Sequence, residues 1–311
     1  MFGECHAHMI MDGVNYREAV AQHQNKVQEE VLRRRFEQYR EKGVSFIRDG
    51  GDALGVSRRA KEIAGDYGID YRTPVFAIHK VGHYGRIVGR GFHTMKEYRA
   101  LVKEAIKQGA DFIKIMTTGI VDFHTYGVIT GEALKKEEVK EMVKIAHQEG
   151  MAVMSHTNGS QAAIDAAEAG VDSLEHGNYL NKEAVEALAD SSTVWVPTLV
   201  TVRNLIGCSR YEDSQIERIR ESGAENIRYF RKSGGQAALG SDAGAHCVYH
   251  GQGICDEYQA FCTIFGENRE LKDWLKQGED RIKEKFRRCR YKVPPESYTD
   301  CRRGFSMEII L

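Results

Sequence analysis

The chain has 311 residues, with 44 basic and 45 acidic side chains and a formal charge of -1. This balance provides no basic surface for nucleic acid or an anionic membrane, so we expect a small-molecule partner, no nucleic acid and no membrane. The length suits one large α/β barrel or two ordinary domains.

The N-terminal segment and the cysteines indicate the cell compartment in which the protein works. The N-terminal segment MFGECHAHMIMDG has neither a positively charged region nor an apolar run of signal or transmembrane length. The seven cysteines are odd in number and lack C-x-x-C spacing, which argues against a disulfide framework and a thiolate zinc knuckle. We therefore expect a reduced, cytoplasmic protein, and a homo-oligomer stays open.

Short apolar strands alternate with amphipathic helices along the chain. We place strands at 2–8, 44–48, 75–79, 112–117, 152–156, 172–176, 194–198 and 237–242. We place helices at 16–42, 57–67, 95–109, 136–150, 160–170, 182–189 and 213–234. Eight strand-helix units predict an α/β fold of the TIM (β/α)8 barrel type. A doubly wound sheet would gather ligands at one switch point, which does not explain metal-type residues on five strands.

The last part of the chain differs in composition. We assign residues 1–266 to the barrel, because residues 267–311 are dense in Lys, Arg, Glu and Asp. The first half of this segment predicts a solvated helix that covers the barrel, and Pro294-Pro295 ends helical order. The runs LRRRF and FRRCRY are interpreted as solvated helix faces, and GGDALG as a turn.

Metal-type side chains stand at the ends of five predicted strands. His6 and His8 form an H-x-H pair, whose imidazoles share one face because side chains alternate along a strand. Four further strand ends carry Lys114, His156, His176 and Asp242. Strand carboxyl ends form the catalytic face of a barrel, so these residues predict one metal site. The plainer alternatives are core or capping histidines, a lysine that reaches a loop, and an aspartate that caps a turn.

Lys114 determines the expected number of metal ions. It shares its strand face with Phe112 and Met116 and should point into the barrel, where divalent cations would repel a buried ammonium. Carbamylation by CO2 would turn the amine into a carboxylate that bridges two divalent ions, for which we expect Zn²⁺. A hydroxide between the ions would form near neutral pH, because metal binding lowers the pKa of water from about 15.7 to about 7. Asp242 is the predicted catalytic acid/base, passing the proton of the nucleophile to the leaving group.

Loops after the third and fourth strands are expected at the same mouth. An arginine there could bind a carboxylate, and histidine or tyrosine could orient substrate or stabilise an oxyanion. The candidate substrate-binding residues are His83, Tyr84, Arg86, His124 and Tyr126. Ordinary loop packing is the alternative for all of them. His246 and His250 follow Asp242 closely and are candidates for supporting the ligands.

Seven segments together resemble the amidohydrolase superfamily, in the binuclear branch near imidazolonepropionase-like and Xaa-Pro dipeptidase-like enzymes. They are GECHAH, GVSFIRDGG, DFIKIMTTG, EEVKEMVKIAHQEGMAVMSHTNG, DSLEHG, VPTLV and LGSDAG, within roughly residues 3 to 253. The resemblance implies that His6 and His8 bind a buried metal and that His156 and His176 bind a more exposed one. It implies that Lys114 bridges the metals as the carbamate, and that Asp242 binds the buried metal and acts as the acid/base.

The resemblance also supplies the reaction class, which is hydrolysis of amides, peptides or cyclic amides. We expect a dipeptide or an N-acyl amino acid as substrate. The alternatives are a mononuclear deaminase of a nitrogen heterocycle and a catalytically weak barrel that serves as a binding protein. Relatives usually carry a small β-sandwich, whereas this chain begins almost at the H-x-H strand, so we expect the barrel without that sandwich.

Overall fold

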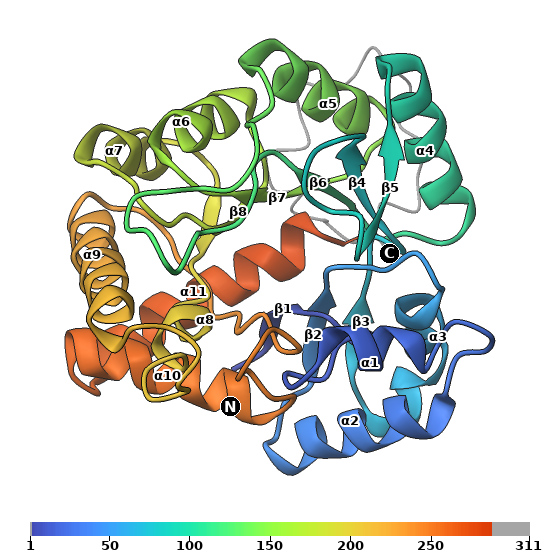
Figure 1. Cartoon of the computed structure of the whole chain (residues 1–311), viewed down its shortest axis with the longest axis horizontal. Helices are drawn as coiled ribbons and strands as arrows, with labels where there is room; N and C mark the ends of the chain where they lie inside the picture. Colours follow the sequence, from blue (N-terminus) through green and yellow to red (C-terminus); the bar gives the residue numbers. More distant parts are fainter. Residues whose placement is uncertain (1, 288–311) are drawn as a thin grey trace, which may run out of the picture.

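The computed structural model describes residues 2–287 (Figure 1). The tail predicted after Pro294-Pro295 and most of the FRRCRY run lie outside the described residues. Within residues 2–287, no helix combines the length and the hydropathy that crossing a membrane requires.

Within residues 2–287, nine parallel strands line the centre of the molecule in two sheets. The first sheet has the order β1 (Glu4–Ala7), β2 (Phe46–Asp49) and β3 (Asp70–Arg72). The second has the order β5 (Gly89–Phe92), β4 (Ala77–Lys80), β6 (Ile113–Met116), β7 (Val153–Thr157), β8 (Ser173–His176) and β9 (Val194–Val196). Every pairing is parallel, which confirms the α/β class. All strands of the described residues belong to these sheets, so that part of the chain contains no β-sandwich.

The third predicted strand, at 75–79, corresponds to β4, and a separate strand, β3, precedes it, so that the barrel wall is divided into two sheets between them. β3 pairs with β2, whereas β4 pairs with β6. Pro74 lies between β3 and β4 and has no backbone N–H to donate, and Val75 adopts a left-handed backbone with a φ of 67°. β5 adds a further strand to the free edge of β4. Neither the break nor β5 was predicted.

The eighth predicted strand, at 237–242, is wrong as a regular strand. Isolated parallel bridges join Ala237 to Trp195 and Ala243 to Ala7. The Asp242 N–H also donates to the His6 carbonyl over 2.7 Å. The fold is therefore TIM-barrel-like, with a segment that spans β9 and β1 in place of one continuous closed sheet.

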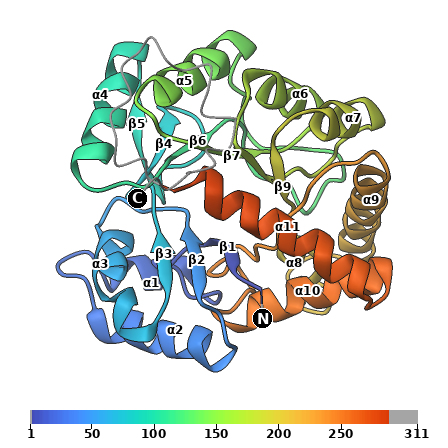
Figure 2. The ribbon, with the colours of Figure 1, turned by 180° about the vertical axis from the view of Figure 1, so that it is seen from behind.

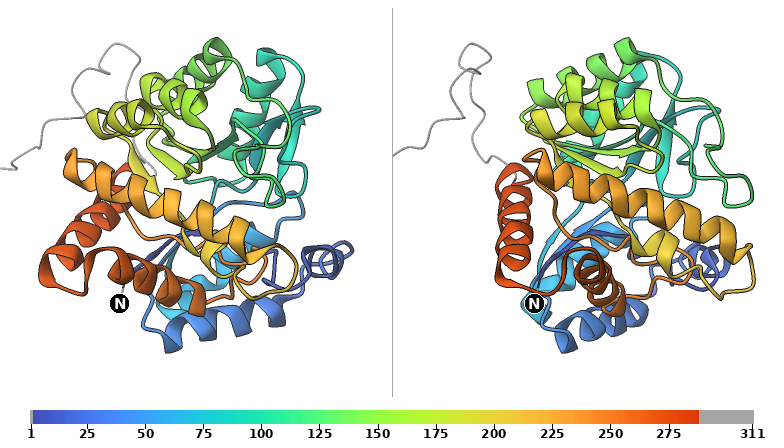
Figure 3. Two further views of the ribbon diagram at one scale, coloured as in Figure 1. Left: turned by 60° about the vertical axis from the view of Figure 1, so that its left-hand side comes forward. Right: turned by 90° about the vertical axis from the view of Figure 1, so that its left-hand side faces the viewer.

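Helices surround the strands (Figures 1 and 3). They are α1 (Tyr16–Ala21), α2 (Glu29–Glu41), α3 (Val56–Ile63), the 3-10 helix η1 (Ala64–Tyr67), α4 (Met95–Lys107), α5 (Lys136–Gln148), α6 (Ser160–Ala169), α7 (Lys182–Asp190), α8 (Val200–Arg203), α9 (Asp213–Lys232), α10 (Gln252–Phe265) and α11 (Arg269–Lys285). Local capping marks several boundaries: Asn181 caps α7 by accepting from the Ala184 N–H, and α6 ends at Gly170 in a left-handed conformation.

Two predictions about the helices need correction. The helix expected at 16–42 is two helices, and between them His23 Nδ1 accepts from the Gln28 N–H over 3.1 Å. The LRRRF run in α2 is not wholly solvated, because the Arg35 side chain is buried and donates to the Met9 carbonyl. The arginine thereby supports the loop that follows β1. The helices α8 and α10 were not predicted.

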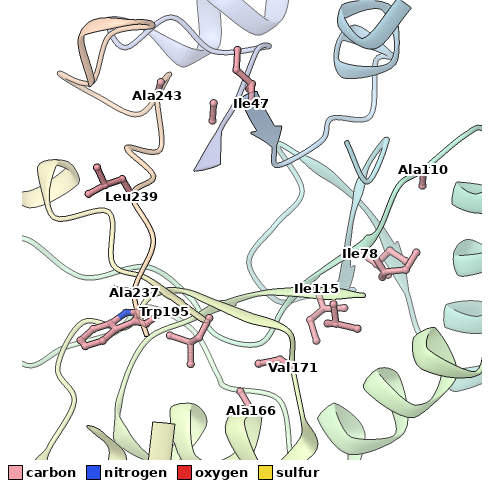
Figure 4. Close-up of a cluster of buried hydrophobic side chains, with 14 of the residues drawn as sticks. Ile47, Ile78, Ala110, Ile115, Ala166, Val171, Trp195, Ala237, Leu239 and Ala243 are labelled. Atoms are coloured by element: carbon pink, nitrogen blue, oxygen red, sulfur yellow. The ribbon is translucent and has the colours of Figure 1, made fainter. Parts of the chain in front are cut away.

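The core has an outer and an inner part. The outer part fills the space between strands and helices and includes Ile47, Ile78, Ile115, Trp195 and Leu239 (Figure 4). The inner part lies among the beginnings of the strands and contains Phe46, Phe112, Met154, Val194, Val196, Ile282 and Phe286. The last two side chains belong to α11 and its C-cap, and Figure 2 shows this helix crossing the strands. α11 thus covers the end where the strands begin and leaves the opposite end for the predicted metal residues.

Candidate metal centre

Strand alternation carries Lys114 into the barrel. In β6, Ile113 and Ile115 join the outer core, whereas Phe112 lies in the inner core. Lys114 shares the inward side with Phe112 and is 1% exposed. The predicted inward orientation of this lysine is confirmed.

Three predicted ligands form a compact set at the end of the barrel opposite α11. The ligand atoms of His6, His8 and Asp242 all lie within 4.8 Å of one another. Asp242 Oδ1 is 3.5 Å from His6 Nε2 and 3.4 Å from His8 Nε2. Lys114 Nζ lies 3.1 Å from His6 Nε2 and 3.4 Å from His8 Nε2. Four side chains from three separate parts of the sequence therefore face a common point.

His156 and His176 flank this set. The ring centres of His176 and His6 are 5.1 Å apart, and those of His156 and His176 are 4.6 Å apart. His156 Nε2 lies 3.0 Å from the Gly119 carbonyl oxygen, and His176 Nδ1 lies 2.8 Å from Thr198 Oγ1. Each ring keeps its other nitrogen for a further contact. The structure thus gathers all six predicted metal residues at one end, as a compact set with two adjacent histidines.

Left-handed backbone places two of these side chains. In β8, Leu174 lies in the outer core and Glu175 faces inward, so alternation alone would turn His176 outward. His176 instead has a φ of 69°, and Asp242 has a φ of 59°. Such conformations are rare for residues other than glycine and concentrate at functional sites. The backbone turn at the end of β8 brings His176 to His156 and His6.

A buried ion pair orients His6 and was missed from the sequence. Glu175 Oε2 lies 2.8 Å from His6 Nδ1, and the Arg48 guanidinium donates to both Glu175 oxygens over 2.9 and 3.0 Å. Arg48 and Glu175 are both fully buried. When a carboxylate accepts from Nδ1–H, the lone pair of Nε2 stays free to bind a metal ion. This is the common arrangement in histidines that ligate metals. The sequence indicated this ion pair only through the charged residues that lie inside the apolar runs SLEHG and FIRDGG.

Gly50 leaves space for the His8 and Lys114 side chains, a role that was not predicted from the sequence. It begins the GGDALG segment, which we interpreted only as a turn. A Cβ on Gly50 would lie 2.2 Å from His8 Cε1 and 2.7 Å from Lys114 Nζ. Even an alanine at this position would therefore collide with two of the predicted metal residues.

Burial dominates the electrostatics of the compact set. It lowers the pKa of the His6 and His8 imidazoles well below their usual value, and the nearby Lys114 amine lowers them further. Burial also lowers the pKa of Lys114 and raises the pKa of Asp242 to about 7, although the lysine opposes the latter shift. In each case burial penalises the charged form. The imidazoles are thus held neutral, which is the form that binds metal ions.

The donor set fits a divalent cation. Imidazole nitrogens and carboxylate oxygens are the ligands that zinc and similar ions take in proteins. Asp242 Oδ1 is buried, and no hydrogen-bond partner for it exists among the described residues. A cation between this oxygen and the two Nε2 atoms would supply the missing partner.

The candidate substrate-binding residues are less concentrated. The Tyr84 ring lies 5.1 Å from the His156 ring, so this tyrosine borders the predicted metal residues. His83 Nδ1 contacts the Glu132 carbonyl, and Arg86 is exposed. The other two pack against loop aromatics, His124 on Tyr211 and Tyr126 on Tyr179.

The two histidines after Asp242 take other partners. His250 contacts the Tyr39 hydroxyl over 3.2 Å and the Met11 carbonyl over 2.8 Å. His246 lies in a separate cluster with two cysteines. In the described part of the chain, neither histidine makes a hydrogen bond or an ion pair with the Asp242 carboxylate, so the geometry does not support the prediction that they hold the ligands in place.

Comparisons with known proteins agree with this architecture. The model of the Amidohydrolase family matches residues 5–291. An uncharacterised protein of Mycobacterium tuberculosis is 28% identical over 132 residues, which are 40% of this chain and 35% of that protein. The match therefore spans about a third of the length of this curated relative.

Solved structures share the fold over most of the chain. A Xaa-Pro dipeptidase with bound methionine in the active site has a TM-score of 0.71 at 21% identity and covers 91% of this chain and 75% of its own. A putative prolidase from Bifidobacterium longum has a TM-score of 0.69 at 21% identity, over 92% of this chain and 69% of its own. Ochratoxinase from A. niger has a TM-score of 0.68 at 20% identity, over 86% and 67%.

Proposed function

The chain belongs to the amidohydrolase family, and from this premise we propose that it is a metal-dependent hydrolase of amide or peptide bonds. The convergence of His6, His8, Asp242 and Lys114 on one buried point is the observation that carries the proposal. Such a cluster at the open end of a barrel has the donor types and the location of a catalytic metal centre.

Two ions account best for the six residues. His6, His8 and Asp242 would hold one ion, and His156 and His176 would hold the second. Lys114, carbamylated by CO2, would bridge them, since its amine lies beside both His6 and His8 and is almost fully buried. The bridging carboxylate would remove the repulsion between a buried ammonium and the cations. Zinc is the metal that we propose for this set of imidazole nitrogen and carboxylate oxygen ligands.

The protein residues divide the chemical work. Divalent ions bound there would supply Lewis-acid polarisation of the scissile carbonyl and a nucleophile at neutral pH. Asp242 would accept the proton of the nucleophile on its carboxylate and deliver it to the leaving nitrogen. Glu175 would keep His6 in the tautomer whose Nε2 faces the site, and Arg48 would hold Glu175 in place.

A dipeptide or an N-acyl amino acid is the substrate class that we propose. The structural neighbours support this choice, because they include a Xaa-Pro dipeptidase and a prolidase complexed with N-methylphosphonate-L-proline. Tyr84 is the candidate substrate contact with the best geometric support, since its ring borders His156.

Metal content and activity test the proposal together. We would purify the protein with bicarbonate and without added zinc, count metal ions per chain by elemental analysis, and assay a panel of dipeptides and N-acyl amino acids. We expect about two ions or more in the unaltered protein, fewer in Lys114→Ala, and loss of hydrolysis in that variant. Lys103→Ala, on the exposed side of α4, is the matched control and should change neither quantity.

Each contrary outcome has a definite meaning. One ion that is insensitive to Lys114 would overturn the bridged centre and favour a mononuclear deaminase. A metal-loaded protein that is inert on the whole panel would overturn the hydrolase and favour a binding protein.

A further inference from the structure

A second cluster of metal-type side chains lies outside the predicted centre. The ligand atoms of Cys208, His246 and Cys247 are all within 4.8 Å of one another. Cys208 lies in the loop between α8 and α9, and the other two lie between Asp242 and α10. All three side chains are partly exposed, so an ion could reach them.

The backbone of both loops is held in place around this cluster. The Cys247 N–H donates to the Gly13 carbonyl over 2.7 Å, and the Asn204 side-chain amide donates to the Cys247 carbonyl over 3.1 Å. Cys247 and Ser209 have left-handed backbones, with φ values of 64° and 59°. These constraints bring a residue that follows β9 to a turn that follows Asp242, about forty positions later in the sequence.

An apolar base lies beneath the two cysteines. Cys208 and Cys247 pack against a buried cluster that includes Val202, Leu205 and Ile216. Burial raises the pKa of the Cys247 thiol, and the neighbouring Cys208 raises it further. The Cys247 side chain is therefore held as a thiol in the absence of a metal ion, and it would release its proton to solvent on binding one.

The ligand types select the ion. Two sulfurs and one imidazole suit zinc and other thiophilic ions, whereas calcium and magnesium require oxygen ligands. In tetrahedral zinc geometry, sulfur and nitrogen ligands would be roughly 3.5 to 3.8 Å apart. The present spread of up to 4.8 Å needs only small side-chain rotations to reach that spacing. A disulfide would use the two sulfurs and leave the imidazole without a role.

We propose that Cys208, His246 and Cys247 bind one zinc-like ion, separate from the predicted centre, with one coordination position left open. The ion would tie the α8–α9 loop to the turn that follows Asp242. It would thereby brace the segment that carries the predicted acid/base, without contacting the reacting atoms.

Cadmium titration of the full chain tests the proposal, because thiolate-to-cadmium charge-transfer absorption reports sulfur ligation. The predicted centre offers only nitrogen and oxygen donors, and Cys5 packs with Phe46 and Phe112 in the inner core, so neither contributes to this absorption. We expect one equivalent of cadmium beyond that held by the predicted centre to give the absorption in the unaltered protein. Cys208→Ser and Cys247→Ser should each abolish it.

Cys255→Ser is the matched control, since this partly exposed thiol contacts the Gly251 carbonyl and lies outside the cluster. It should leave the absorption unchanged. No absorption in the unaltered protein, or full absorption in both Cys208→Ser and Cys247→Ser, would overturn the proposal.

Alkylation of the unaltered protein gives a test that requires no substitution. One equivalent of zinc beyond that held by the predicted centre should slow alkylation of Cys208 and Cys247 at least about ten-fold, as measured by peptide mass spectrometry, and leave Cys255 unaffected. Equal alkylation rates with and without zinc would contradict the site. Because this readout concerns only thiols, it is independent of hydrolytic activity and of Lys114.

Discussion

β2 reaches the predicted metal centre through a residue that has no side chain. Gly50 follows β2, and a Cβ at this position would lie 2.2 Å from His8 Cε1 and 2.7 Å from Lys114 Nζ. Because neither neighbour is a freely moving surface group, the collision would displace at least one predicted metal residue. The requirement for glycine here comes from a close approach rather than from the turn that the sequence indicated.

Gly50→Ala should therefore weaken metal binding while the fold persists. We expect a loss of about ten-fold or more in metal affinity, which is the size of effect seen when the neighbours of metal ligands are altered. Competition with a chelator of known affinity measures it. Gly65→Ala is the control, because a Cβ on Gly65 meets no atom within 4 Å. Equal affinities in the two variants would show that the space beside His8 has no role in metal binding.

Lys114 and His176 differ in how far local sequence determines their orientation. The inward direction of Lys114 follows from alternation with Ile113 and Ile115, which is a property of any regular strand. His176 lies on the strand side that alternation turns outward, and its left-handed φ of 69° reverses this. Sequence alone predicted His176 as part of the site, but not the backbone conformation that places it there.

A side chain of α10 caps α8, the short helix that follows β9. The Glu257 carboxylate of α10 accepts from the Leu199 and Val200 N–H groups over 3.0 and 2.9 Å. Thr198, next to this cap, contacts His176. α10 therefore supports a strand end that borders the predicted metal centre, although it was not itself predicted.

The capping carboxylate predicts a pH dependence of stability. Burial raises the pKa of Glu257 from 4.5 to about 8, and the two backbone donors oppose the shift. Between about pH 4.5 and about pH 8, Glu257 keeps its proton in the folded protein, whereas the same group has released it in the unfolded chain. The free energy of unfolding should therefore fall as pH rises, by up to about 1.4 kcal/mol per pH unit from this group. The contribution is complete below about pH 4.5 and lost above about pH 8.

Glu257→Gln should remove this part of the dependence, because an amide does not titrate. Urea unfolding at a series of pH values, for this variant and for the unaltered protein, measures the difference between the two slopes. Glu225→Gln, an exposed position on α9, is the control and should retain the original slope. Parallel curves for Glu257→Gln and the unaltered protein would contradict the prediction.

The molecule as a whole has a covered end and an open end. α11 crosses the beginnings of the strands (Figure 2), where Phe286 packs edge-on against Phe112 with ring centres 5.2 Å apart. Arg48 joins the two ends, since its guanidinium lies 4.3 Å from the Phe286 ring centre and also donates to Glu175. The charged C-terminal helix therefore contributes to the inner core and is more than a solvated cover.

Phe286→Ala should destabilise the protein by about 3 to 5 kcal/mol, the usual cost of removing a buried phenylalanine. Denaturant unfolding followed by circular dichroism measures it. Gln277→Ala, on the exposed side of α11, should change the stability by less than about 0.5 kcal/mol. Similar stabilities for the two variants would mean that α11 adds little to the core.

Patterns within the sequence were sufficient for the α/β class, for most strand and helix positions and for the choice of six residues that the structure brings together at one end of the barrel. These features depend on local periodicity and on the order of strand ends, which a single chain displays directly. The break at Pro74, the separation of α1 from α2 and the irregular segment at 237–242 were not predicted. The break and the irregular segment depend on how neighbouring strands share hydrogen bonds, and a contact between His23 and the Gln28 N–H lies between the two helices. Local periodicity records neither.

The Glu175 contact to His6, the close approach at Gly50 and the cluster of Cys208, His246 and Cys247 became visible only in three dimensions. Each joins residues separated by tens to more than a hundred positions. The alternation of a strand tells which side a residue faces, but not which distant side chain meets it there. That pairing is set by the packing of all the strands and helices together, and it positions the donors of both candidate metal sites.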